Sequence, residues 1–122
     1  MRIGILAVAF CAGLLSASGV NAAGKILNNS ELAAFFSGKT YKYYNPGGKK
    51  LATITYKANG SIASKLDKDG KVYAGKWTVN GNKYCTSYDY RPKTACFQVR
   101  TTATVGKFED LANGKLDGFF VQ

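Results

Sequence analysis

Residues 76–99 read KWTVNGNKYCTSYDYRPKTACFQV, and this stretch decides the fold. Apolar and polar side chains alternate on both sides of Asn80-Gly81, a dipeptide typical of the tight turns in β-hairpins. A further alternating run follows, and Cys85 and Cys96 flank the loop between the last two runs. The stretch therefore predicts three consecutive antiparallel strands with a cysteine on each of the last two.

The two cysteines predict a structural disulfide. If Tyr88 faces Lys93 across a four-residue loop at 89–92, Cys85 lies directly opposite Cys96, close enough for an S–S bond. A redox pair usually has C-x-x-C spacing, and a metal site needs more ligands. We therefore expect a crosslink that contributes about 2–3 kcal/mol to stability, and no metal or cofactor.

The first 22 residues are typical of a secretory signal peptide. Arg2 is followed by an apolar run over residues 3–15, and Val20-Asn21-Ala22 has the small residues of a cleavage site. The run is shorter than the roughly 20 residues that a membrane span needs. We predict cleavage with loss of Cys11, leaving residues 23–122 as one periplasmic or secreted domain with no transmembrane segment.

Regular turn signals divide this domain into short strands. They are Gly47-Gly48, Asn59-Gly60, Asp69-Gly70, Asn80-Gly81, Arg91-Pro92 and Asn113-Gly114. Turns roughly ten residues apart, separated by runs rich in Thr, Tyr, Val and Phe, predict a mainly β protein. We expect an antiparallel β-meander over about 39–121, forming a small barrel or a strongly curved sheet.

One short N-terminal helix is expected at about 29–37. Asn28 and Glu31 have the spacing of a capping box, and Gly38 can end the helix. Its apolar stripe suits a plug for the open end of the sheet or barrel. The stripe consists of Leu32, Phe35 and Phe36.

Turn geometry predicts which side chains share the buried face. Two-residue turns at Asn80-Gly81 and Asp69-Gly70, with a three-residue turn ending at Gly60, align one apolar row across five strands. The row is Tyr56, Ile62, Trp77, Tyr84 and Phe97, and Tyr73 joins the core in the same register. In the C-terminal hairpin either a two- or a three-residue turn is possible, and the core candidates are Phe108, Leu111, Leu116, Phe119 and Val121.

The opposite face is basic. It collects Lys57, Lys65, Lys76, Lys83 and Arg100. The chain has a net charge of +10, about +9 without Arg2, which favours anionic partners. A solvated sheet face protected against edge pairing explains the same pattern.

Catalytic chemistry is limited by what the sequence lacks. There is no histidine, which removes Ser-His, Cys-His and His-based acid–base systems. Of the seven carboxylates none is expected in the apolar surroundings that raise a carboxyl pKa. DKDG at 67–70 lacks the later ligands of a calcium loop, and no motif for specific nucleic-acid binding is present. We expect a protein that is not an enzyme.

Tyrosines beside cations mark the candidate binding site. Not all of Tyr43, Tyr44, Tyr88 and Tyr90 can be buried at once, and exposed tyrosine beside Arg or Lys suits sugars or protein partners. Tyrosines that merely cover the rim of a small barrel are the alternative. The predicted ligand-binding residues are Tyr88, Tyr90, Arg91 and Lys93, with Lys76 and Lys83 on the adjoining face and Lys57 and Lys65 beyond them.

Three segments carry a family resemblance: ELAAFFSGKT at 31–40, GKWTVNGNKYC at 75–85 and CFQV at 96–99. With the signal peptide, they make the chain resemble a family of small uncharacterised secreted proteins of Gram-negative bacteria. The resemblance implies export, a β domain and the Cys85–Cys96 bond, and it supplies no catalytic residues.

These observations favour a non-enzymatic periplasmic or secreted binding protein. Its basic outer face is expected to meet an anionic envelope polymer, either lipopolysaccharide or an acidic glycan. The alternative is a protein-interaction module, inhibitor or immunity-like, that contacts an envelope protein through the tyrosine-rich loop at Tyr88–Lys93.

Overall fold

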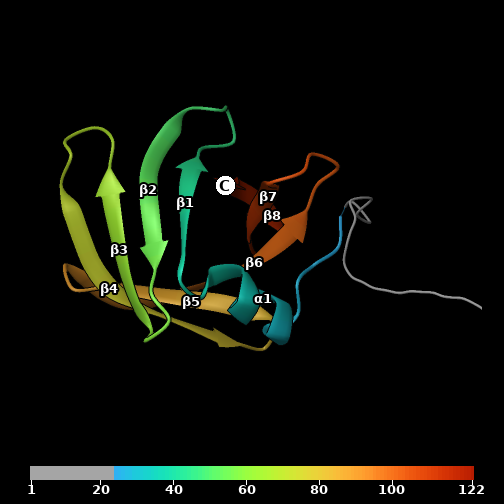
Figure 1. Cartoon of the computed structure of the whole chain (residues 1–122), viewed down its shortest axis with the longest axis horizontal. Helices are drawn as coiled ribbons and strands as arrows, with labels where there is room; N and C mark the ends of the chain where they lie inside the picture. Colours follow the sequence, from blue (N-terminus) through green and yellow to red (C-terminus); the bar gives the residue numbers. More distant parts are fainter. Residues whose placement is uncertain (1–23) are drawn as a thin grey trace, which may run out of the picture.

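The computed structural model describes residues 24–122, which form a closed antiparallel barrel of eight strands and one short helix (Figure 1). The predicted signal peptide at residues 1–22 lies outside the described residues. The elements are α1 (Asn29–Phe36), β1 (Lys39–Tyr44), β2 (Lys50–Tyr56), β3 (Ser61–Leu66), β4 (Val72–Asn80), β5 (Lys83–Tyr88), β6 (Arg91–Thr101), β7 (Lys107–Ala112) and β8 (Lys115–Val121). Each strand pairs with the next, and β8 pairs back with β1. The predicted meander is confirmed, and it closes as a barrel.

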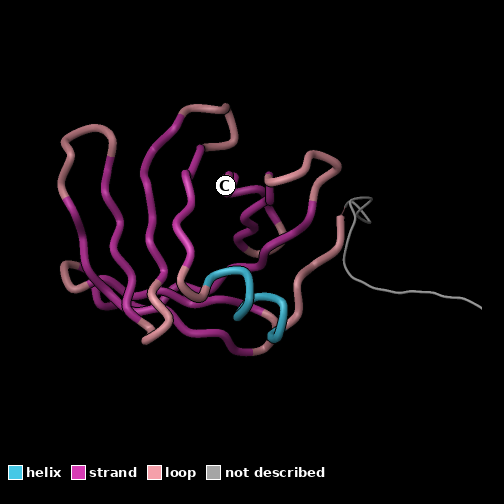
Figure 2. Tube along the Cα trace, in the orientation of Figure 1, coloured by secondary structure: helices cyan, strands magenta, loops and turns pink. Residues whose placement is uncertain are grey.

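Helix α1 lies across one end of the barrel, as Figures 1 and 2 show. The predicted capping box is present: the Asn28 side chain accepts from the Glu31 N–H, and the Glu31 carboxylate accepts from the Asn28 N–H. Phe36 is fully buried, with its ring centroid 4.2 Å from that of Tyr56 and 4.6 Å from that of Tyr84. The helix therefore plugs this end with an aromatic side chain.

Strand direction separates the loops into two groups. Because the strands alternate in direction, the β2–β3, β4–β5 and β6–β7 connections lie at the helix end. The β1–β2, β3–β4, β5–β6 and β7–β8 connections surround the opposite end, where no helix lies within residues 24–122. We call these the closed end and the open end. No helix within this range is long and apolar enough to cross a membrane.

The predicted buried face is confirmed, with corrections to its register. Tyr56 faces Ile62 as expected, and Gly60 has a positive φ of 92°. Trp77, however, faces Thr86 instead of Tyr84, because the β4–β5 turn is Gly81-Asn82, both residues having positive φ. Ile62 likewise faces Gly75, because the β3–β4 loop is longer than two residues.

Both errors displace the pairing by two residues, which keeps every side chain on its predicted face. The inward-facing members Tyr56, Ile62, Trp77 and Tyr84 are buried, and Phe97 is half-buried. The indole Nε1 of Trp77 donates to the Lys57 carbonyl at 2.8 Å. Its polar atom is therefore satisfied inside the protein.

The predicted pairing of Cys85 with Cys96 is confirmed. The two residues lie opposite each other in β5 and β6, with a Cα–Cα distance of 4.0 Å, and form a disulfide. The loop between them differs from expectation, because Tyr88 faces Arg91 and not Lys93. The turn has only two residues, Asp89 and Tyr90, and an irregularity in β6 takes up the other residues.

The core contribution of the C-terminal hairpin was predicted correctly only in part. Phe120 is fully buried, whereas Phe119 is only half-buried and Leu116 is exposed. The reason is a β-bulge: Leu111 faces Leu116, but Asp110 faces Gly118, so Asp117 is an extra residue in β8. One extra residue moves all later side chains to the other face. Leu111 is buried as expected, and Phe108 and Val121 are half-buried.

Candidate functional site: a pocket at the open end of the barrel

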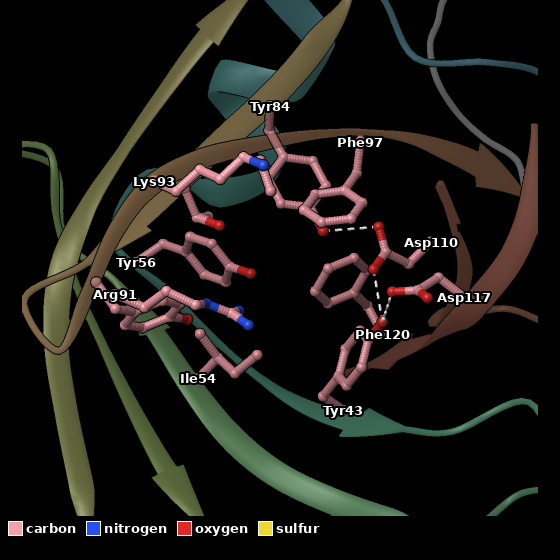
Figure 3. A pocket seen from close by; sticks show the side chains of 13 residues that line it. Tyr43, Ile54, Tyr56, Tyr84, Arg91, Lys93, Phe97, Asp110, Asp117 and Phe120 are labelled. Atoms are coloured by element: carbon pink, nitrogen blue, oxygen red, sulfur yellow. Dashed lines mark hydrogen bonds between the residues drawn. The ribbon is translucent and has the colours of Figure 1, made fainter. Parts of the chain in front are cut away.

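A pocket of about 240 Å³ enters the barrel from its open end (Figure 3). Its floor is aromatic, because Tyr56, Tyr84 and Phe120, which pack on the helix plug, also line the pocket. Polar and charged side chains line its walls. They are Tyr43, Thr86, Tyr88, Arg91, Lys93, Asp110 and Asp117.

Asp110 is the main departure from the sequence-based expectation. It lies on the inner face of β7 and is 2% exposed, although no carboxylate was expected in such surroundings. The phenols of Tyr43 and Tyr84 each donate to it, with O···O distances of 2.6 Å. Burial raises the pKa of Asp110 to about 6, and the two phenol hydrogen bonds oppose this rise. The carboxylate is thus held by two donors but has no ion-pair partner among residues 24–122.

Gly118 makes room for this arrangement. A Cβ added there would lie 2.5 Å from the Tyr43 hydroxyl and 2.6 Å from the Tyr44 carbonyl oxygen. The Tyr43 ring therefore occupies space that any side chain at position 118 would take. The neighbouring bulge also brings Asp117 to the pocket, where its Oδ2 lies 3.4 Å from the same Tyr43 hydroxyl.

Tyr56 presents a buried hydroxyl to the pocket. The residue is 1% exposed, and Figure 3 shows its hydroxyl directed into the space between the two walls. No hydrogen bond joins this hydroxyl to any group of residues 24–122, whereas the buried Tyr41 hydroxyl donates to the Phe35 carbonyl at 2.5 Å. A buried hydroxyl without a partner costs free energy. Tyr56 is thus a polar group available to a ligand.

Arg91 and Lys93 stand on the wall opposite the two aspartates (Figure 3). Neither forms an ion pair within the described chain, where the ion pairs are Lys25–Glu31, Lys50–Asp67 and Arg100–Glu109. The guanidinium of Arg91 is 5.8 Å from the Tyr90 ring centroid. Two cations are therefore free to meet an anion at the mouth.

The structure brings together three of the four residues predicted in the β5–β6 loop. Tyr88, Arg91 and Lys93 line the pocket, and the Tyr88 hydroxyl lies 3.1 Å from that of Ser64. Tyr90 is 60% exposed at the turn, with its ring centroid 4.7 Å from that of Tyr73. Tyr73, predicted in the core, is half-buried at this end.

The four lysines predicted on the outer face do not join the pocket. Lys57, Lys65, Lys76 and Lys83 are exposed. Lys57 and Lys83 lie beside the turns of the closed end, whereas Lys65 lies near the open end and Lys76 in the middle of β4. These side chains form a dispersed basic exterior, separate from the pocket.

Comparisons with known proteins do not show a family for this chain. No family model matches it, and no solved structure matches it. A stretch of 66 residues is 33% identical to eukaryotic translation initiation factor 2A of Caenorhabditis elegans. That stretch covers 54% of this chain, which spans only 11% of the length of the factor.

The chemistry of the pocket suits binding. Within residues 24–122 no group of three or more His, Cys, Asp or Glu side chains could hold a metal ion. The raised pKa values of Tyr43, Tyr56 and Tyr84, which burial causes, keep these phenols protonated and able to donate. The site therefore offers phenol donors, two cations and two carboxylates on the walls of a preformed cavity.

Proposed function

We propose that this protein is an exported, non-enzymatic binding protein that holds an anionic group of its ligand at the open end of the barrel. The observation that carries the proposal is the placement of Arg91 and Lys93, which have no ion-pair partner in the described chain, beside the free hydroxyl of Tyr56. Guanidinium and ammonium groups recognise carboxylates and phosphates, and a phenol adds a neutral donor.

An anionic envelope polymer, such as lipopolysaccharide or an acidic glycan, is the ligand that we propose. The pocket suits a terminal acidic group of such a polymer, because it is too small for a long segment of chain. Five of the seven carboxylates lie at the open end, which leaves the exterior of the barrel mainly cationic. Lys57, Lys65, Lys76 and Lys83 would attract the polymer over a longer range.

The test is binding of a short acidic oligosaccharide, measured by calorimetry at low salt. Replacing both Arg91 and Lys93 with alanine should weaken binding by about tenfold or more, because two charge-assisted contacts are lost. Lys115→Ala removes an exposed cation at the same end that does not line the pocket, and should have little effect. Equal losses in both variants would contradict binding in the pocket.

Reversal of the four exterior lysines to glutamate tests their separate contribution. The reversal should mainly lower the association rate constant and the salt dependence of binding. The dissociation rate constant should change less. Unchanged binding of the polymer after this reversal would exclude a role for the basic exterior.

A second candidate function is protein interaction through the β5–β6 turn. The exposure of Tyr90, at 60%, favours it, because tyrosine is enriched at interfaces. If it is correct, Tyr90→Ala abolishes a stoichiometric complex with an envelope protein and leaves binding of the oligosaccharide unchanged.

A further inference from the structure

The wall opposite the cations imposes a second requirement on the ligand. Asp110 and Asp117 both approach the Tyr43 hydroxyl, at 2.6 Å and 3.4 Å. A phenol carries a single proton, so it can neutralise part of only one of the two carboxylates. The Tyr43 hydroxyl lies closer to Asp110 than to Asp117. Asp117 therefore keeps its capacity to accept a hydrogen bond from a ligand.

No cation of the described chain forms an ion pair with either aspartate. Asp110 is moreover almost fully buried, where the attraction between opposite charges is stronger than in water. A ligand with only acidic groups would meet repulsion on this wall, and a ligand with only a basic group would meet repulsion from Arg91 and Lys93. Figure 3 shows the two charged walls facing each other across the pocket.

We infer that the ligand group held in this pocket is a small zwitterion, with its ammonium group beside Asp110 and Asp117 and its carboxylate or phosphate beside Arg91 and Lys93. The inference rests on the proposed function, since it adds a cation to the anionic group already assigned to the mouth. The hydroxyl of Tyr56, which is free within residues 24–122, lies between the two walls and donates to the acidic group.

The volume agrees with a compact molecule. The pocket has a volume of about 240 Å³. This is below the range of drug-sized sites, which begins at about 300 Å³. Aminoalkyl acids of a few carbons, free or at the end of a polymer, meet both the size and the charge.

The experiment uses ω-amino acids from glycine to 6-aminohexanoate, and aminoalkyl phosphates of the same lengths, as probes. Butanoate and butyl phosphate carry only an acidic group and butylamine carries only an ammonium group, so the three serve as halves of the zwitterions. Calorimetry on the mature protein should show one preferred distance between the ammonium and the acidic group. The probe with that distance should bind at least about tenfold more tightly than either half. Equal affinity for that zwitterion and for the acidic half would overturn the inference.

Variants of the two aspartates test whether the acidic wall holds the ammonium group. Asp110→Asn keeps the size of the side chain and should lower the affinity for the zwitterion to that of its acidic half, whose own affinity does not fall. Asp117→Asn changes an exposed residue and should also lower the affinity for the zwitterion. It serves as the test if Asp110→Asn does not fold. Asp89→Asn is the matched control, an exposed carboxylate of the β5–β6 turn outside the pocket. A preference for the zwitterion that survives both Asp110→Asn and Asp117→Asn contradicts the inference.

The proposed function and the assignment of a zwitterion can fail separately. If Arg91→Ala abolishes binding of the acidic half but the amine adds nothing, the proposed function stands and the zwitterion is wrong. If Arg91→Ala leaves the binding of every probe unchanged, the proposed function is wrong as well. Vesicles that carry an aminoethyl phosphate headgroup are then added as competitors of the preferred probe. If they displace the probe, the zwitterion belongs to a membrane-tethered group, and if they do not, it is a free molecule.

Discussion

The two ends of this barrel treat the same residue type in opposite ways. At the closed end the Tyr41 hydroxyl donates to the Phe35 carbonyl, and its ring stacks on that of Phe35 with centroids 4.5 Å apart. Toward the open end the Tyr56 hydroxyl has no partner in the described chain, and Tyr43 and Tyr84 donate to a buried carboxylate. Tyrosine is therefore a packing residue at one end and a polar lining at the other.

The difference follows from what covers each end. Helix α1 excludes water from the closed end, so polar groups there must find partners within the protein. The open end has only loops around it within residues 24–122, and a ligand can supply the missing partners. We therefore propose that stability is concentrated at the closed end and ligand binding at the open end.

The largest expected effect is at the closed end. Phe36→Ala removes a fully buried ring that contacts Tyr56, Tyr84 and Phe120, and should lower the free energy of unfolding by about 3–5 kcal/mol. Urea unfolding measures the loss. Val105→Ala, at an 80% exposed position of the β6–β7 loop, should change stability by less than about 0.5 kcal/mol. If Phe36→Ala lowers the free energy of unfolding by less than about 1 kcal/mol, the closed end is not the main source of stability.

The next effect is at the open end and depends on pH. Burial raises the pKa of Asp110 from 3.8 to about 6, so the folded protein holds this proton more tightly than the unfolded chain. The stability due to this group is therefore complete below pH 4, falls as the pH rises, and is lost above about pH 6. The full difference amounts to about 3 kcal/mol.

Asp110→Asn tests this dependence. The amide can still pair with both phenols, accepting from one and donating to the other, but it does not ionise. Urea unfolding between pH 4 and pH 7 should show a smaller decline in the variant than in the wild type. Asp89→Asn, at an exposed position, should keep the wild-type decline. An identical decline in the wild type and in Asp110→Asn would show that Asp110 is not buried as described.

A smaller effect is expected from Gly118→Ala. The added Cβ would lie 2.6 Å from the backbone oxygen of Tyr44, which cannot move aside easily, and 2.5 Å from the Tyr43 hydroxyl. Displacement of Tyr43 should cost about 1–3 kcal/mol and weaken its hydrogen bond to Asp110.

The measurement is urea unfolding together with the carbon chemical shift of the Asp110 carboxyl against pH. Loss of one donor should move the pKa of Asp110 further upward, since that hydrogen bond favours the charged form. Gly47→Ala is the control, because its Cβ would meet only the Asn45 side chain, at 3.4 Å. Equal stability of the two glycine variants would mean that Tyr43 does not depend on Gly118.

The sequence predicts the inward-facing residues of the plugged core well and the lining of the pocket only in part. Alternation determines which residues face inward, and register errors of two residues, as at Trp77, leave that unchanged. The capping spacing of Asn28 and Glu31 and the opposed cysteines are local patterns, and both predictions are confirmed. A bulge has no such local pattern, and the bulge at Asp117 exchanged Phe119 for Phe120 in the core.

A usable signal for Asp110 was present in the sequence. Phe108 was a core candidate, and Asp110 follows it by two residues, so alternation alone places its carboxylate on the inner face. The partners of Asp110 could not be predicted, because Tyr84 lies two strands away in the sheet and Tyr43 reaches Asp110 only when β8 pairs with β1. Closure of the barrel created the site.

The smallest expected effect concerns the cap of helix α1. The Asn28 side chain accepts from the Glu31 N–H at 2.9 Å, and Asn28→Ala removes this partner. Stability should fall by about 1 kcal/mol, whereas Asn28→Asp, which keeps an acceptor, should lose little. Ser30→Ala, an exposed change in the first turn of the same helix, is the control for helix propensity.

The comparison of the two ends makes this small change informative. Because Asn28 lies at the closed end, its variant should lower stability in urea and leave the affinity for every pocket probe unchanged. Weaker binding in Asn28→Ala would show that the helix plug also shapes the pocket through Tyr56 and Tyr84, which contact both. The separation of stability from binding would then fail at the shared aromatic floor.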